Sequence, residues 1–361
     1  MTRQILLNPG PVTLSKRLRD ALLRPDLCHR EQEFIDLQNR IREKLLDVYN
    51  LSKNEWASVL LTGSGTAAVE AMLTSCAPAH GKMLIIENGV YGERMTRIAD
   101  THNIDHIVLH HEWGEAIDLK RIEDVLQYHK ELTHIAIVHH ETTTGCLNNL
   151  ETLAAVCKRY NVALLIDGVS SFGAEDIYFQ DWYIAACAAT ANKCLHGVPG
   201  TAFVIVNRNA LEVMQGTPAR TVYLDLVNYL KSQDTGGTPF TQSIQTFYAL
   251  DEALDELKEN GGQPQRKKEY LHRMEIVREG LIRIGVQPLL KQEVSSCVLN
   301  AFHLPDGLAY QDLHDQLKEK GYIIYAGQGG LVKSLFRVSC MGDITEEDMK
   351  LFISSFEEIL S

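Results

Sequence analysis

Residues 162–168 read VALLIDG, an apolar run that ends in a carboxylate and a glycine. Similar short apolar runs occupy residues 59–61, 83–86, 135–138 and 202–206, and each is followed by a turn signal or a helical pattern. Runs rich in Ile, Val and Leu that alternate with helix-length segments are typical of a mostly parallel sheet with helices on both faces. The sequence therefore predicts an α/β fold.

Hydrophobic periodicity places helices outside these runs. Apolar residues recur at steps of three and four from Phe34 to Val48, and a second helical segment runs from Gln245 to Glu259. The stretch NGGQP at residues 260–264 breaks that segment, and a basic helix follows with strands near residues 296–303, 322–325 and 335–339. Alternating hydrophobicity in the first of these strands favours an antiparallel sheet. We predict a large domain of residues 1–260, N-terminal arm included, and a smaller C-terminal α+β domain of residues 261–361.

Composition narrows the class of protein. Of the 361 residues 45% are hydrophobic and 23% charged, as in ordinary globular proteins, and the net charge of -12 disfavours nucleic acid as a partner. The eight cysteines show no metal-ligand spacing, so we expect reduced thiols and no metal. Because the chain lacks a signal-peptide core and any apolar stretch of about 18 residues, we expect a cytoplasmic protein that does not enter a membrane.

The residues that follow parallel strands are where chemistry is expected. Asp167 ends one such run, and Lys193 follows in the stretch TANK at residues 190–193. An electron-sink cofactor such as pyridoxal phosphate needs a lysine that holds it as a Schiff base and a carboxylate that keeps its pyridine nitrogen protonated. Taken alone, Asp167 could be a helix cap and Lys193 a solvated lysine, but together they favour a cofactor site.

Three further motifs fit the same cofactor. The turn TGSGT at residues 62–66 could cradle a phosphate through backbone N–H groups and hydroxyls, although it could also be a simple cap. Tyr91 follows the next strand, where its ring could stack on a pyridine or fill the core. The stretch TTTG at residues 142–145 offers hydroxyls or forms a turn.

Two other site classes are weakly supported. His139 and His140 are adjacent on a strand end, so their side chains point to opposite faces and cannot readily share a metal ion. No G-x-S-x-G elbow follows a strand, which disfavours a Ser-His-Asp hydrolase.

The motifs GSGTAAVE, ENGVYGERM, HHETTTG, LLIDGVSSFG, ATANKCLHGVPGTAFVI and LFRVS occur in this order, and the chain resembles the 2-aminoethylphosphonate:pyruvate aminotransferases. These enzymes belong to the class V, fold-type I group that depends on pyridoxal phosphate, together with alanine:glyoxylate and serine:pyruvate enzymes. The resemblance runs from the stretch NPGP at residues 8–11 nearly to the C-terminus, and so covers both predicted domains.

The resemblance implies a homodimer with active sites at the subunit interface. Lys193 and Asp167 would be the catalytic residues, Thr241 would reach the phosphate from the neighbouring subunit, and Arg337 would grip the acidic group of the substrate with its planar fork. The residues that it assigns to the cofactor are Ser64, Gly65, Thr66, Tyr91, Thr143, Asp167, Asn192, Lys193 and Thr241.

The chain departs from the degradative enzymes at two places. Residues 26–31 read DLCHRE where those enzymes carry a tryptophan followed by acidic residues, and Ser243 stands in place of a proline. The first difference introduces Arg30 in an expected substrate loop, and we therefore include Arg30 among the substrate-binding candidates.

These features lead to one functional hypothesis and several rivals. We expect amino transfer between 2-aminoethylphosphonate and pyruvate, giving phosphonoacetaldehyde and alanine, with the biosynthetic direction open. The first rival is an alanine or serine aminotransferase that uses glyoxylate or pyruvate. A cofactor-dependent lyase or cysteine desulfurase is the next, for which Cys340 is the candidate cysteine on a C-terminal loop. A binding protein without activity is disfavoured by the pair Lys193 and Asp167.

Overall fold

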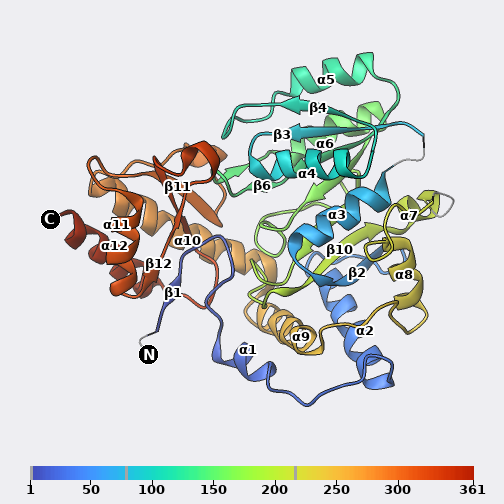
Figure 1. Cartoon of the computed structure of the whole chain (residues 1–361), viewed down its shortest axis with the longest axis horizontal. Coiled ribbons are helices and arrows are strands. Elements are labelled where there is room, and N and C mark those ends of the chain that lie inside the picture. The colour runs from blue at the N-terminus through green and yellow to red at the C-terminus, as the bar shows by residue number, and fades with distance from the viewer. Residues whose placement is uncertain (1–2, 78–79, 215–217) are drawn as a thin grey trace.

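The computed structural model describes residues 3–77, 80–214 and 218–361. A seven-stranded sheet with the order β2-β10-β9-β8-β5-β3-β4 forms its centre (Figure 1). Neighbouring strands are parallel except for β10, which is antiparallel to both of its neighbours. The strands are β2 (Trp56–Gly63), β3 (Lys82–Glu87), β4 (His106–His110), β5 (Leu132–Val138), β8 (Ala163–Asp167), β9 (Ile184–Thr190) and β10 (Gly200–Asn207). The predicted α/β fold with a mostly parallel sheet is confirmed.

Helices cover both faces of this sheet because alternate strand residues point to opposite sides. In β2, for example, Leu60 packs into one apolar core while Val59 and Leu61 pack into the other. The first core is closed by α2 (Gln32–Asp47), α5 (Leu119–Tyr128), α6 (Leu150–Tyr160) and α9 (Ile244–Glu259). The second core is closed by α3 (Gly65–Cys76), α4 (Val90–Thr101), α7 (Arg208–Met214) and α8 (Leu226–Asp234).

The predicted helices near residues 34–48 and 245–259 correspond to α2 and α9. Two strands of the large sheet, β4 and β9, were not expected. Strand β9 reads IAACAAT, which contains no run of β-branched residues. Because alanine is depleted in strands, this sequence does not predict a strand. The small side chains of β9 are all buried, and they let α3 pack closely on the sheet beside them.

The C-terminal part is a smaller layer built on an antiparallel sheet with the order β11-β14-β13, as the alternating pattern predicted. Its strands are β11 (Leu299–His303), β13 (Tyr325–Ala326) and β14 (Leu335–Ser339), and its helices are α10 (Gly262–Arg283), α11 (Tyr310–Glu319) and α12 (Glu346–Leu360). The short elements β6 (His140–Glu141), β7 (Cys146–Leu147), α1 (Lys16–Ala21), η1 (Gln292–Val294) and η2 (Gly329–Leu331) complete the structure.

The N-terminal segment joins this C-terminal layer. Strand β1 (Ile5–Leu6) pairs in parallel with β12 (Tyr322–Ile323), and Ile5 and Leu7 are buried in the C-terminal core. Strand β1 and helix α12 therefore lie on the same side of the large sheet (Figure 1). The division at residue 260 stays a prediction, and the N-terminal arm that we grouped with residues 1–260 packs at β1 against the other part. In the described ranges, no helix combines the length and the hydropathy that crossing a membrane requires.

The close packing of α10 on α12 gives a first prediction. A Cβ at Gly280 would lie 2.7–2.9 Å from three side-chain carbons of Ile353. We expect Gly280→Ala to lower the free energy of unfolding by about 1–2 kcal/mol, because overpacking outweighs the helix propensity of alanine. Urea denaturation measures this change. The control Glu279→Ala, on the exposed side of the same helix, should stay within about 0.5 kcal/mol of the parent protein. An equal effect of both substitutions would contradict the packing explanation.

Candidate active site

The ends of five strands bring the candidate residues to one edge of the sheet. Strands β3, β5, β8 and β9 are mutually parallel, and β2 has the same direction because β10 is antiparallel to both β2 and β9. The segments that follow these strands, which begin at Ser64, Asn88, His139, Gly168 and Ala191, therefore meet at the carboxyl edge.

Lys193 lies in the turn after β9 and is 9% exposed. Its Nζ is 5.6 Å from the centroid of the Tyr91 ring, and no acceptor in the described part of the chain lies within hydrogen-bond distance of it. The N-terminal loop crosses the lysine stem: Gly10 has a φ of +119°, and a Cβ there would lie 3.3 Å from Lys193 Cγ. The structure thus presents a largely buried amine whose hydrogen bonds are available to another molecule.

Asp167 lies on the same edge, at the end of β8, and is buried. Its Oδ1 accepts a hydrogen bond from the backbone N–H of Val169 at 3.0 Å. Burial raises the pKa of the Asp167 carboxyl, while the Val169 N–H, Lys193 and Arg94 act in the opposite direction. A cationic partner at this carboxylate would relieve its desolvation. Asn192, beside Lys193, accepts a hydrogen bond from Thr190 Oγ1 at 2.7 Å.

The glycine-rich turn after β2 leads into α3, as expected, with Ser64 as the N-cap residue of that helix. The helix has no side-chain cap and no acidic residue in its first turn, so its positive end carries no counter-charge of its own. A Cβ at Gly65 would lie 2.8 Å from Val169 Cγ1, which shows how closely this helix start approaches the loop after Asp167. The arrangement can bind an anion near Asp167.

Arg94 is a member of the site that sequence reasoning missed. Its Nη1 donates to Thr66 Oγ1 at 3.0 Å, and its guanidinium carbon lies 4.6 Å from the centroid of the Tyr91 ring. Burial raises the pKa of the Tyr91 hydroxyl, but nearby groups that include Lys193, Arg94 and Arg337 outweigh it and lower this pKa overall. The signal was present, since residues three apart on a helix share a face.

Glu141 is a second missed member, which the sequence analysis quoted only as a letter of the motif HHETTTG. The fully buried carboxylate accepts hydrogen bonds from Thr143 N at 3.1 Å and Thr143 Oγ1 at 2.6 Å on Oε1. Its Oε2 accepts from Tyr91 N at 3.2 Å and Gly92 N at 3.3 Å. A Cβ at Gly89 would lie 2.3 Å from the carboxyl carbon, so only glycine leaves room here. Burial raises the pKa of Glu141, and the Thr143 hydrogen bonds partly offset this effect.

Arg337 projects from β14 toward the same edge and is 3% exposed. Its Nε donates to Ala326 O at 2.8 Å, and its Nη1 donates to Thr142 O at 2.9 Å and to Gln328 Oε1 at 3.0 Å. Burial lowers the pKa of the guanidinium. The bond to Thr142 links the C-terminal layer to the TTTG turn beside Tyr91.

Two predicted residues lie on the surface instead. Thr241 is exposed just before α9 and adjoins Gln242, whose Oε1 accepts from Thr62 Oγ1 at 2.8 Å. Arg30 is exposed in the segment between α1 and α2, which runs along the lower edge in Figure 1, and makes no hydrogen bond or ion pair with any residue that the structure describes. A single copy of the chain therefore does not bring Arg30 to Arg337.

Cys340, the candidate cysteine for a desulfurase, lies in the loop directly after β14, but it is not accessible there. The side chain is fully buried in the C-terminal core, and burial raises the pKa of its thiol to about 12. A nucleophilic cysteine needs an accessible thiolate.

The adjacent histidines His139 and His140 make hydrogen bonds inside the protein. His139 Nδ1 lies near Ser171 Oγ, and His140 Nδ1 lies near Ser170 O. Among the residues described, no cluster of three His, Cys, Asp or Glu side chains could hold a metal ion.

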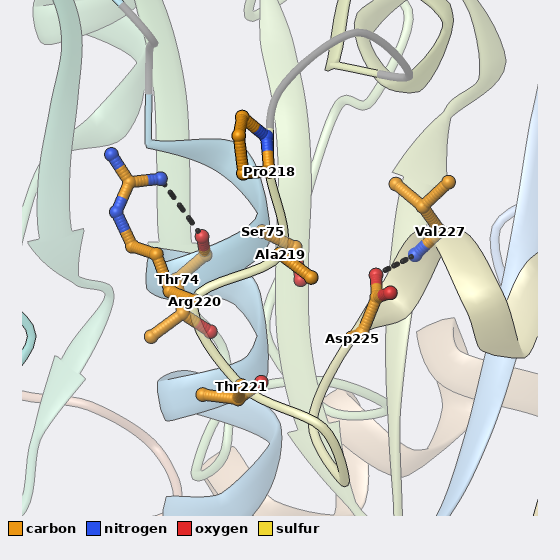
Figure 2. Close-up of a pocket in the computed structure, with 8 residues that line it drawn as sticks. All are labelled: Thr74, Ser75, Pro218, Ala219, Arg220, Thr221, Asp225 and Val227. Atoms are coloured by element: carbon orange, nitrogen blue, oxygen red, sulfur yellow. Dashed lines mark hydrogen bonds between the residues drawn. The ribbon is translucent and has the colours of Figure 1, made fainter.

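A separate small hollow lies at the opposite, C-terminal end of α3 (Figure 2). Arg220 crosses it to donate to Thr74 O and Ala77 O, both at 3.4 Å, while Asp225 accepts from Val227 N as the cap of α8. The two Arg220 hydrogen bonds tie the chain before α8 to the end of α3, and the hollow is remote from the carboxyl edge of the sheet.

Comparison with known proteins identifies the family. Residues 18–352 match the model described as aminotransferase class-V. The chain is 35% identical to a 2-aminoethylphosphonate–pyruvate transaminase of Bacillus cytotoxicus over 98% of this chain and 97% of that protein, and 34% identical to one of Bacillus cereus over 97% and 96%. Its fold is similar to a crystal structure of alanine–glyoxylate aminotransferase from Nostoc sp., with a TM-score of 0.93, 26% identity, and coverage of 100% of this chain and 96% of that one. The chain therefore belongs to the class-V aminotransferase family.

Proposed function

We propose that this aminotransferase interconverts 2-aminoethylphosphonate and pyruvate with phosphonoacetaldehyde and alanine. The observation that carries the proposal is the identity of 35% with the Bacillus cytotoxicus transaminase, which extends over nearly the whole of both chains. The buried Arg337 supports it, since a guanidinium at the carboxyl edge can bind either a phosphonate or a carboxylate. Both acids must be accepted, because the donor and the acceptor take turns in one site.

Class-V aminotransferases use pyridoxal 5'-phosphate, and the site described above fits that group. Lys193 has a largely buried amine without an acceptor among the described residues, and the buried Asp167 carboxylate lies on the same edge of the sheet. A phosphate would complement the uncapped start of α3 and the Arg94 guanidinium. When bound, the cofactor supplies an electron sink for the carbon that loses its proton.

Each candidate residue has a distinct proposed role. Lys193 would hold the cofactor and then move a proton between the substrate carbon and the cofactor, as base and as acid. Asp167 would pair with the pyridine nitrogen, and Tyr91 would stack on the ring. The residues proposed to bind the phosphate and the other polar atoms of the cofactor are Ser64, Gly65, Thr66, Arg94, Thr143, Asn192 and, from a second copy, Thr241.

Glu141 would act as a positioning residue rather than as an acid or base. Its two oxygens are both occupied by donors, two from Thr143 and two from the start of α4. These bonds fix Tyr91 relative to Thr143, and both side chains would contact the cofactor. The carboxylate would therefore affect cofactor affinity without touching the reacting atoms.

A homodimer with shared sites belongs to the same proposal. Thr241 and Arg30 are exposed in one copy, so each would contribute only if a neighbouring copy brings it to the cofactor or the substrate. Arg30 would then add a cation near the acid group, which favours a phosphonate because a dianion gains more from extra donors.

Alanine–glyoxylate amino transfer is the second candidate, favoured by the TM-score of 0.93 to the Nostoc enzyme. A desulfurase is disfavoured, because Cys340 is buried. The likeness to a NifS-like protein, at 15% identity, concerns the fold alone.

The cofactor site is tested by absorption spectroscopy. The purified protein should be yellow, and borohydride should fix the cofactor onto a peptide that contains Lys193. Lys193→Ala should lose the covalent link and fall in turnover by roughly a hundredfold or more, because proton transfer by a positioned group contributes on that scale. Lys158→Ala, an exposed lysine on α6, should behave as the parent protein. Labelling of another lysine would refute the assignment.

The positioning role of Glu141 is tested with Glu141→Gln. The amide would turn its NH2 group against the N–H donors of either Thr143 or α4, and leaving those donors unpaired should cost about 1–3 kcal/mol of unfolding free energy. We also expect a weaker affinity for pyridoxal phosphate, measured by fluorescence titration of the apoprotein. Glu319→Gln, exposed at the end of α11, serves as the control. Cofactor affinity equal to that of the control would exclude the role.

The substrate assignment is tested with a panel of amino donors against pyruvate and glyoxylate. We expect kcat/KM for 2-aminoethylphosphonate to exceed that for alanine, and Arg30→Ala to lower the ratio of the two values while the exposed Arg19→Ala does not. A higher value for alanine with glyoxylate would favour the second candidate. An unchanged ratio in Arg30→Ala would remove Arg30 from substrate selection.

A further inference from the structure

The donors of Arg337 are largely used inside the protein. A guanidinium has five N–H groups, one on Nε and two on each terminal nitrogen. Ala326 O accepts from Nε, and Thr142 O and Gln328 Oε1 both accept from Nη1. Within the described residues, only Nη2 has no acceptor. In this arrangement Nη2 is the nitrogen of Arg337 that is open to another molecule.

The amide of Gln328 has a defined orientation for a chemical reason. Arginine only donates, so the Gln328 atom that faces Nη1 must be the acceptor oxygen. The Thr143 hydroxyl lies 3.4 Å from the same oxygen. The amide nitrogen consequently points elsewhere, and no acceptor in the described part of the protein lies within hydrogen-bond distance of it. Gln328 thus has two unused N–H donors on an amide that contacts the Arg337 guanidinium, whose Nη2 is also unused.

The loop around Gln328 is held in place from both sides. Gly327 donates to Leu335 O at 2.8 Å, and a Cβ at Gly327 would lie 2.3 Å from Leu331 O. Gly329 has a φ of +52°, and a Cβ there would lie 2.5 Å from the ring of Trp113. Trp113 comes from the large part of the molecule, after β4, and its Nε1 donates to Glu93 at 2.8 Å. Gln328 is therefore a half-buried residue on a loop that packs against the large part.

We propose that Gln328 is a second binding residue for the acidic group of the substrate, and that its Nε2 together with Arg337 Nη2 forms a composite fork. This inference rests on the proposed function, in which Arg337 binds that acid. A fork divided between two side chains can open or close through the rotatable bonds of glutamine. It therefore adapts to the different oxygen spacings of a phosphonate and a carboxylate, which one pocket must bind in turn. Because the amide is neutral, it adds donors without a second full charge.

The test measures binding without turnover. Ethylphosphonate and propionate carry the two acid groups but lack an amino or keto group, and calorimetric titration of each into the holoenzyme gives a Kd. Gln328→Leu should weaken both acids by about tenfold, as expected for the loss of one hydrogen bond to a charged group. Gln328→Glu keeps the acceptor for Arg337 but loses the donor, and should weaken both acids further. Gln316→Leu, an exposed glutamine on α11, is the matched control and should bind as the parent does.

Three results would overturn the inference. Equal or tighter binding by Gln328→Leu would mean that Gln328 is a bystander or competes with the acid for Nη1. Full rescue by Gln328→Glu would mean that Gln328 only orients Arg337. If the parent protein binds neither acid, the Arg337 pocket itself is refuted, and the composite fork with it.

The proposed function fails in a different way. If 2-aminoethylphosphonate is not a substrate but Gln328→Leu still weakens propionate and ethylphosphonate, the composite fork stands and only the amino donor changes. If turnover of 2-aminoethylphosphonate is efficient while its KM and both Kd values are unaffected in Gln328→Leu, the function stands and the composite fork is excluded.

Discussion

Four donors converge on the buried carboxylate of Glu141, and their positions constrain most of the site. Two come from Thr143 and two from the first turn of α4, so the TTTG turn and the helix that carries Tyr91 and Arg94 are fixed to one anion. A buried carboxylate is tolerated only when hydrogen bonds replace its lost hydration. The glycine at position 89 is required for the same reason, because any side chain there would occupy the space of the carboxyl group.

The C-terminal layer is attached at the same place. Arg337 donates to Thr142 O, and Gln328 contacts both Arg337 and Thr143, so the proposed acid-binding and cofactor-binding sides of the site share one turn of backbone. A shift of the C-terminal layer would move Arg337 relative to Tyr91. The position of Arg337 relative to Tyr91 therefore depends on an interface between two parts of the chain rather than on one rigid loop.

The sequence predicted the features that have a local cause. The runs that became β2, β3, β5, β8 and β10 are rich in β-branched and leucine residues, and the turns after them carry Ser64, Asp167 and Lys193, which the structure places on one edge. Strand β9 was missed because its alanines are explained by the close packing of α3, which is distant in the sequence. The residues near β9 in the sequence do not indicate a strand. Arg94 was missed although it lies one helical turn after Tyr91 in α4, whereas Glu141 and Gln328 were missed for a reason related to that of β9. Each matters through partners that are distant in the sequence or hidden in a motif that suggested another chemistry.

The pairing of β1 with β12 has a consequence for how the protein is made. The first strand of the chain emerges from the ribosome long before residues 322–323, its only neighbours in the two-stranded sheet, have been synthesised. The loop that contains Gly10, which crosses the stem of Lys193, lies a few residues after that strand. Domains generally fold as units during synthesis, in order from the N-terminus, but this segment cannot reach its final position until the C-terminal layer exists. We therefore expect the loop that crosses the Lys193 stem to take its final position late in synthesis, after the C-terminal layer has formed.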